Sequence, residues 1–148
     1  MFDKTKIIAI GSDHGGFELK EFLLKKMGEA GYKLKDFGCH STVSVDYPDI
    51  IHPLANDISN NVYEKGIIIC GSGNGVAMVA NKHKYVRAAL CWDLKQTELS
   101  RQHNDANVLS LPGRFIDFNL AYEMVELFLN TSFDGGRHKV RVDKISNY

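Results

Sequence analysis

The chain has 148 residues, 44% of them hydrophobic and 24% charged, a composition that fits one packed domain over residues 1–148 and not a disordered chain. Its 18 lysines and arginines balance its 18 aspartates and glutamates, so no excess of charge points to nucleic acid or to another highly charged partner. No apolar run approaches the roughly 20 residues that cross a bilayer, and residues 1–14 lack the apolar segment of a secretory signal, so we expect a cytoplasmic protein without a membrane partner.

The first 38 residues predict a strand, a helix and a second strand. Residues 6–11 form a short apolar run with β-branched side chains, which is typical of a buried strand. Residues 15–31 place apolar side chains at helical spacing, and Gly31 is a suitable stop. Residues 32–38 alternate between apolar and polar side chains and predict a second strand. The apolar stripe of the helix consists of Leu19, Phe22, Leu23 and Met27.

Residues 46–61 carry the apolar stripe of a second helix. Pro48 suits the first turn of a helix, where its missing N–H has no intrahelical partner to lose. Pro53 falls within the same pattern, so either the helix is kinked or its regular part begins nearer Pro53. The stripe consists of Ile50, Ile51, Leu54, Ala55 and Ile58.

Strands and helices continue to alternate in the rest of the chain. Asp93 and Asp117 stand where the N-caps of two of these helices are expected. Residues 134–148 form a basic, mixed tail. The predicted strands are residues 65–70, 86–91 and 107–112, and the predicted helices are residues 75–83, 93–104 and 117–130. The stripe of the last helix is the clearest and consists of Leu120, Ala121, Met124, Val125, Phe128 and Leu129.

Strands that alternate with helices pair in parallel through right-handed crossovers. We therefore expect an α/β fold, a Rossmann-like three-layer α/β/α sandwich with a five-stranded parallel sheet. In such sheets ligands bind beyond the carboxyl ends of the strands. This rule selects four candidate segments, namely residues 11–16, 70–75, 91–93 and 110–114.

Residues 70–75 (CGSGNG) follow the third predicted strand. Gly71, Gly73 and Gly75 permit a tight turn and a close approach of the backbone to a ligand. The helix that follows has free N–H groups, which suit a phosphate or an oxyanion formed during a reaction. The segment is not a P-loop, because the GxxxxGK[ST] spacing and its lysine are missing, and it departs from the GxGxxG pattern at Val76.

Cys70 is the last residue of the third predicted strand. A thiol beside N–H donors and a helix N-terminus should have a lowered pKa, so that it can act as a nucleophile or a general base. Taken alone, however, Cys70 is better explained as a buried residue at a strand end, and Cys39 and Cys91 keep that interpretation. The three cysteines form no CxxC pair and no zinc-ligand spacing, so we expect free thiols and no metal site.

Two polar residues follow the first predicted strand. Asp13 and His14 reach the same edge of the sheet as Cys70 if strands one and three are neighbours. An acid beside an imidazole can exchange protons with a sugar hydroxyl, and His14 can bind phosphate. The alternative interpretation makes Asp13 the N-cap of the first helix.

Two further polar groups lie late in the chain. His103 and Asn104 stand near the end of a predicted helix, where they suit either a binding site or a solvated turn. Arg137 and Arg141 are four residues apart and therefore on one helical face. Two guanidinium groups on one face suit a phosphate clamp, and they equally suit a solvated basic surface.

In combination, these motifs resemble the type B ribose 5-phosphate isomerases, in a family that also includes galactose 6-phosphate isomerase subunits. The matching segments are "GSDHGGFELK", "DYP", "ICGSGNGVAMVANK", "RAALC", "LSRQHNDANVL" and "GGRHKVRV", which span nearly the whole chain in the family's order. The resemblance implies interconversion of an aldose phosphate and a ketose phosphate through an enediolate, without a metal or an organic cofactor. It also implies a sheet order of 2-1-3-5-4 and a homodimer, or a dimer of dimers, with sites built between two subunits.

The resemblance also implies a role for each matching residue. Cys70 matches the base that moves a proton between C1 and C2 of the sugar, and Ser72 matches a neighbouring hydroxyl that is threonine in many members. Some members use a glutamate further along the loop, but residues 76–80 contain no acid. His103 matches the residue that helps open the furanose ring, and Asp13 a polar partner of the sugar. The remaining matches are the N–H donors around Gly71, Gly73, Asn74 and Gly75, the substrate contacts Tyr47 and Asn104, and the phosphate-binding set His14, Arg114, Arg137 and Arg141.

Three functions fit these residues. We expect an isomerase of ribose 5-phosphate; the alternatives are an isomerase of a six-carbon sugar phosphate, such as galactose or allose 6-phosphate, and a non-catalytic module that binds a phosphosugar or a nucleotide. Cys70 and His103 together argue against the module, because binding alone needs neither a thiol nor a ring-opening acid. Residues 38–48 help to set the length of the pocket but do not identify the substrate.

Overall fold

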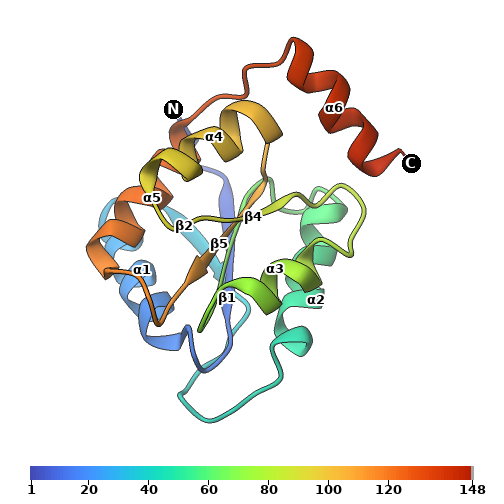
Figure 1. Ribbon diagram of the computed structural model, residues 1–148. Coiled ribbons are helices and arrows are strands. Elements are labelled where there is room, and N and C mark those ends of the chain that lie inside the picture. Colours follow the sequence, from blue (N-terminus) through green and yellow to red (C-terminus); the bar gives the residue numbers. More distant parts are fainter. Residues whose placement is uncertain (148) are drawn as a thin grey trace.

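The computed structural model describes residues 1–147 and contains a five-stranded sheet between two layers of helices (Figure 1). The strand order is β2-β1-β3-β5-β4, and all four strand pairs are parallel. This confirms the expected α/β sandwich and the strand order that the family resemblance implied. The strands are β1 (Ile7–Ser12), β2 (Lys33–Asp36), β3 (Gly66–Cys70), β4 (Ala88–Leu90) and β5 (Val108–Pro112).

The central strand β3 is buried along its whole length. It pairs with β1 on one side and β5 on the other, and helices cover both faces of the sheet, so a continuous apolar run is required there. The edge strand β4 pairs only with β5 and is shorter than residues 86–91, over which it was predicted. Its start is determined by Asn81, whose side-chain amide exchanges two hydrogen bonds, of 3.0 and 2.8 Å, with the backbone of Ala88.

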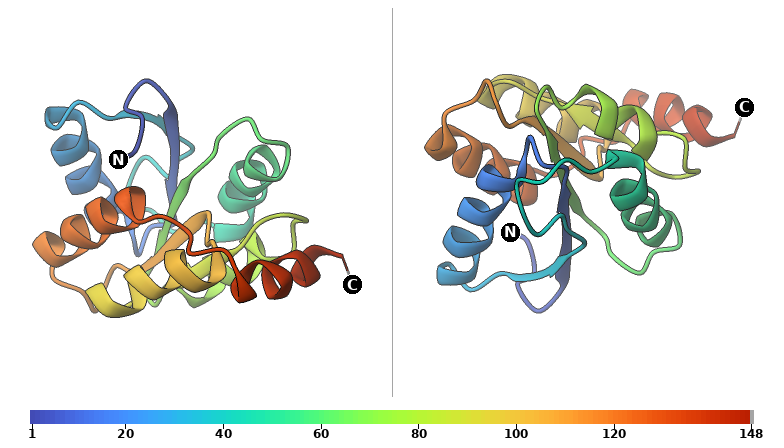
Figure 2. Two further views of the ribbon diagram at one scale, coloured as in Figure 1. Left: turned by 90° about the horizontal axis from the view of Figure 1, so that it is seen from above. Right: turned by 90° about the horizontal axis from the view of Figure 1, so that it is seen from below.

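Six helices flank the sheet. α1 and α5 pack their apolar stripes on one face of the sheet, and α2 and α3 pack on the other. α4 packs against α5, and α6 packs against α4 at the outside of the molecule (Figure 2). None of the helices in residues 1–147 combines the length and the apolar character needed to cross a bilayer. The helices are α1 (Phe17–Glu29), α2 (Tyr47–Ser59), α3 (Asn74–Ala80), α4 (Leu94–Asn104), α5 (Phe118–Asn130) and α6 (Arg137–Ser146).

Two predicted helix caps and the two prolines of α2 bear on where the helices begin. The side chain of Asp93 accepts a hydrogen bond of 2.7 Å from the N–H of Gln96, which confirms this cap, and Asp117 caps α5 in the same way. α2 begins at Tyr47 and continues through Pro53, so the alternative start near Pro53 is wrong. A proline removes the hydrogen bond to the carbonyl four residues earlier. That carbonyl belongs to Asp49, which is exposed and can bond to water instead.

Candidate active site

Cys70 lies at the carboxyl end of β3, at the edge of the sheet where the following loop begins. Its Sγ accepts a hydrogen bond of 3.1 Å from the backbone N–H of Gly73, and only 5% of the residue is exposed. Gly73 adopts the left-handed conformation, with φ of 77°, and its carbonyl accepts a hydrogen bond of 2.6 Å from Ser110 Oγ on β5. A Cβ at Gly73 would lie 2.5 Å from the side chain of Leu90, so only glycine fits there.

The rest of the glycine loop leads into α3. Ser72 Oγ accepts a hydrogen bond of 3.2 Å from the N–H of Asn74, the first residue of that helix. Gly75 lies directly against the ring of Tyr47, because a Cβ there would be 2.7 Å from Tyr47 Cζ. The thiol of Cys70, the hydroxyl of Ser72 and the ring of Tyr47 from α2 therefore lie around the start of α3.

Asp13 lies beside this loop, at the end of β1. Its N–H donates to the carbonyl of Ile69 at 3.2 Å, which joins the turn after β1 to the residue before Cys70. Its Oδ1 accepts hydrogen bonds from the N–H groups of Gly15 and Gly16, at 2.8 and 3.2 Å. α1 begins later, with Gly16 at the N-cap position, so the interpretation of Asp13 as the N-cap of this helix is wrong. Asp13 instead closes the turn that precedes the helix.

Two basic side chains lie at the same edge of the sheet. The guanidinium of Arg114 lies over Gly71, where a Cβ would be 3.3 Å from Nη1. The backbone N–H of Arg114 donates a hydrogen bond of 3.1 Å to the Gly71 carbonyl. His14 Nδ1 accepts a hydrogen bond of 3.2 Å from the N–H of Val45. Both side chains line a cavity of about 470 Å³. Glu18 also lines this cavity, which brings the Arg114 guanidinium next to the glycine loop.

The other predicted site residues lie at the opposite end of the molecule. His103 and Asn104 end α4, and the chain then turns into Val108, the first residue of β5. Cys70 pairs instead with Pro112, the last residue of β5. Four residues of strand span about 13 Å. Figure 1 shows the end of α4 and α6 at the top, and the turns after β1, β3 and β5 together at the lower edge.

The residues at this second end form their own group. The imidazole rings of His103 and His138 stack, with centroids 4.2 Å apart and ring planes 9° apart. His103, Asn104, His138 and Arg141 line a hollow of about 330 Å³. Partial burial lowers the pKa of His138, and the neighbouring His103, Arg137 and Arg141 lower it further. Arg137 and Arg141 are both exposed on α6.

The structure therefore divides the predicted site residues into two groups. Cys70, Ser72, Asp13, His14, Tyr47, Arg114 and the loop residues Gly71, Gly73, Asn74 and Gly75 gather at the carboxyl edge of the sheet. His103, Asn104, Arg137 and Arg141 gather around α6. We call these the carboxyl-edge group and the α6 group. Within one chain the two groups do not meet.

Sequence reasoning missed two neighbours of His103, namely Asp134 and His138. His138 follows Arg137 in the segment that was noted only for its arginines. Arg101, from the same polar segment as His103, has a structural role: its Nη1 donates to Asp105 Oδ1 and to the carbonyl of Ala106, at 2.8 and 2.6 Å. Cys39 and Cys91 are buried, as expected, and burial raises the pKa of the Cys91 thiol.

Comparison with known proteins adds a second line of observation. The family model described as ribose/galactose isomerase matches residues 8–145. The ribose-5-phosphate isomerase B of Escherichia coli is 38% identical over 95% of each chain. Among solved structures, a ribose 5-phosphate isomerase from Thermotoga maritima is 44% identical, covers 97% of this chain and 99% of its own, and superposes with a TM-score of 0.94. The Mycoplasma genitalium ribose-5-phosphate isomerase B, solved with bound ribulose 5-phosphate, is 39% identical over 99% and 97% of the two chains, with a TM-score of 0.93.

Proposed function

Because the chain belongs to the ribose/galactose isomerase family and is thus a sugar phosphate isomerase, we propose that it interconverts ribose 5-phosphate and ribulose 5-phosphate. The observation that carries the chemistry is the position of Cys70, whose Sγ lies 3.1 Å from the N–H of Gly73 at the end of β3. The choice of substrate is supported by relatives named for ribose 5-phosphate, one of them solved with the ketose product.

Cys70 is the proposed base. Removing a proton from the carbon beside a carbonyl is unfavourable unless the carbonyl oxygen is stabilised as charge develops on it. The thiolate of Cys70 takes the proton from C2 of the open-chain aldose, and the C–H electron pair forms the C1–C2 double bond of the enediolate. The oxygen that becomes charged is held by N–H groups of the loop other than those of Gly73 and Asn74, which already donate to Cys70 Sγ and Ser72 Oγ. Return of the proton to C1, with transfer of the hydroxyl proton from O2 to O1, completes the ketose.

Asp13 and Ser72 are proposed to hold the sugar beside this base. The turn of Asp13 is tied to β3 through Ile69, and Ser72 stands between Gly71 and Gly73 in the loop. Tyr47 closes the loop from the side of α2, where its ring contacts Gly75. These three side chains can bind sugar hydroxyls while Cys70 acts on the carbon.

The α6 group is proposed to come from a second subunit. Ring opening requires a group that protonates the ring oxygen, and His103 is the proposed acid. His103 lies at the far end of α4 from the carboxyl-edge group, so it cannot reach the sugar in its own chain's loop. In a symmetric dimer that joins the two ends, each site receives Cys70 from one chain and His103 from the other.

The phosphate is proposed to bind between the two groups. His14 and Arg114 line one cavity together with Glu18, and Arg137 and Arg141 present two guanidinium groups one helical turn apart. A bidentate guanidinium fits the geometry of a phosphate. Assembly of the dimer would therefore surround the dianion with cations from both subunits.

An assay of three substrates tests the proposal. Purified protein should convert ribose 5-phosphate to ribulose 5-phosphate faster than it isomerises galactose 6-phosphate or allose 6-phosphate. Cys70→Ala should lower kcat by several orders of magnitude, whereas the matched changes Cys39→Ala and Cys91→Ala, at buried cysteines elsewhere, should retain activity. Faster turnover of a six-carbon substrate would replace the proposed substrate, and near-normal kcat in Cys70→Ala would exclude the thiol as the base.

A further inference from the structure

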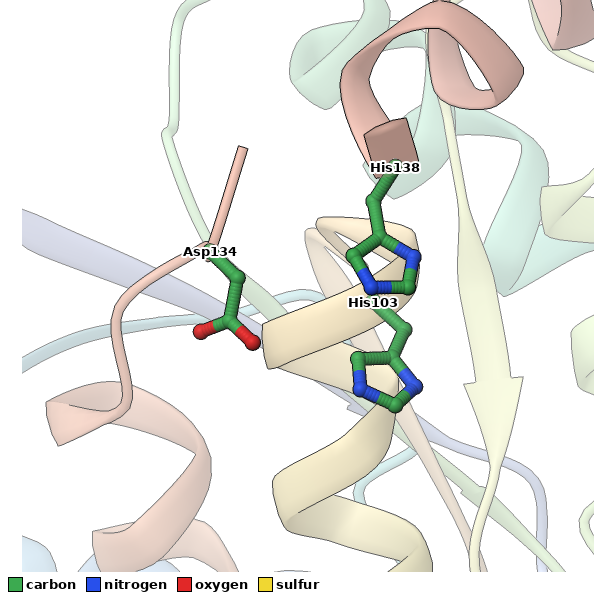
Figure 3. Close-up of side chains that lie close together, drawn as sticks. All are labelled: His103, Asp134 and His138. Carbon is green, nitrogen blue, oxygen red and sulfur yellow. The ribbon is translucent and has the colours of Figure 1, made fainter. Parts of the chain in front are cut away.

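Three ligating side chains meet beside α6. His103, Asp134 and His138 each offer one nitrogen or oxygen atom, and these atoms all lie within 4.8 Å of one another. Figure 3 shows the two imidazole rings stacked and the carboxylate of Asp134 beside them. Two imidazoles and one carboxylate form a set that binds zinc and similar divalent ions in proteins.

The backbone holds these residues in place. The N–H of Asp134 donates to the carbonyl of Gln102 at 3.0 Å, which fixes the loop before α6 to the last turn of α4. Gly135 and Gly136 then adopt φ values of 66° and 54°, which turn the chain sharply into α6. His138 lies in the first turn of this helix. The three side chains therefore come from two segments that are joined by a backbone hydrogen bond.

The local electrostatics permit a cation at this point. His103 lies in the last turn of α4, where the helix dipole presents partial negative charge. The Asp134 carboxylate adds a negative charge on the other side, while Arg137 and Arg141 on α6 oppose a cation. In the single chain both arginines are exposed to solvent, which screens this repulsion.

We propose that His103, Asp134 and His138 bind a divalent transition-metal ion of the zinc class, and that this ion inhibits the enzyme by occupying His103. The inhibition rests on the proposed function, in which His103 opens the sugar ring, but the binding does not. A metal lies in the plane of an imidazole at about 2.0–2.1 Å from its nitrogen. The stacked rings must therefore turn apart, and the three ligand atoms must draw together around the ion. Three protein ligands leave the fourth position of a tetrahedral zinc ion for water.

Calorimetric titration of Zn²⁺ into the Cys70→Ala protein tests the binding, because this variant removes the thiol that would compete for zinc. We expect one ion per chain. Asp134→Asn and His138→Asn should each weaken binding at least tenfold, since changes to groups behind the ligands alone cost about 10- to 100-fold. Asp143→Asn, the same change at an exposed aspartate on α6 itself, should have no effect. His52→Gln serves as a second control, because His52 Nδ1 lies 2.8 Å from His83 Nε2 and the two residues are the other histidine pair in residues 1–147.

The experiments test the metal site and the inhibition separately. Unchanged zinc affinity in Asp134→Asn and His138→Asn, or loss of the bound ion in His52→Gln, would overturn the site. Inhibition is measured on the enzyme that retains Cys70. There, the Zn²⁺ concentration that halves the activity should be at least ten times higher for Asp134→Asn than for the wild type. Equal inhibition of Asp134→Asn and Asp143→Asn would overturn the regulatory role. If the protein had no isomerase activity, the proposed function would fail, and the calorimetric titration would still decide whether the metal site exists.

Discussion

The position of His103 predicts that two inactive variants restore activity when they share a dimer. Cys70 lies at the carboxyl edge of the sheet, and His103 lies where α4 returns to the start of β5. In a dimer with sites between subunits, a mixed dimer of Cys70→Ala and His103→Asn contains one site with both changes and one site with neither. Random pairing of equal amounts makes about half of the dimers mixed, so the preparation should recover about one quarter of wild-type activity.

Co-expression of the two variants with different affinity tags allows the activity of the mixed dimer to be measured directly. Tandem purification isolates mixed dimers, which should have about half of the wild-type activity because one of their two sites is intact. The matched control pairs Cys70→Ala with Ser72→Ala. Both changes lie on the carboxyl-edge side, so every site of this mixed dimer carries one defect and no activity should return. Isolated mixed dimers of Cys70→Ala and His103→Asn that are no more active than their parents would refute the shared site.

Three further changes test individual contacts. Arg137→Ala should raise KM roughly ten- to a hundredfold, because a charge-assisted hydrogen bond to the phosphate contributes about 1.5–3 kcal/mol. Arg137→Lys should recover only part of this loss, because lysine keeps the charge but not the bidentate geometry. If KM and the inhibition by inorganic phosphate were both unchanged, Arg137 would be a solvated surface cation. Gly75→Ala places a Cβ 2.7 Å from Tyr47 Cζ. Because this ring is the far end of an exposed side chain and can move aside, we expect a loss of activity with little change in the free energy of unfolding. Gly28→Ala, where nothing lies within 4 Å, should retain activity; equal activity in the two variants would show that the contact of Gly75 with the tyrosine ring does not matter for catalysis. Burial lowers the pKa of Lys65 to about 8, so the folded state binds this proton less tightly than the unfolded chain does. The free energy of unfolding is therefore reduced by the full amount below pH 8. This reduction disappears as the pH rises toward the pKa of lysine in the unfolded chain. Lys65→Met should therefore stabilise the protein at pH 7 by on the order of 2 kcal/mol in urea unfolding, an advantage that shrinks above pH 8; a gain that is constant with pH would assign it to packing.

Local sequence signals were sufficient for the five strands and the first five helices, but they missed α6 (Arg137–Ser146) as a helix, since residues 134–148 were described only as a basic, mixed tail. The run GIIIC predicted a buried strand because both faces of a central parallel strand are covered, and β3 is buried throughout. Asp93 and Asp117 marked helix starts because their side chains can pair with free N–H groups within three residues. These signals are short-range, so they can be read without knowledge of the rest of the chain. The strand order, by contrast, came only from the resemblance to a family, because apolar periodicity does not say which strands are neighbours.

Some features depend on contacts between distant parts of the chain and could not be read in this way. Lys20 is fully buried in the first turn of α1, beside the apolar stripe, because its Nζ forms an ion pair of 2.8 Å with Asp36 on β2. Nothing in the local pattern around Lys20 indicates this partner. Asp134 and His138 likewise become neighbours of His103 only because the turn before α6 lies against α4.

The motifs of the candidate site illustrate the same division. Short sequence segments made Cys70, the glycine loop and His103 candidates, and the resemblance to a family, not the local chemistry alone, implied their roles. Only the tertiary structure decided which of them lie together. Asp13 and Arg114 reach the loop of Cys70 because the turns after parallel strands meet at one edge of the sheet. His103 lies at the other edge, because a helix that joins two parallel strands must run back along the sheet and ends where the next strand begins.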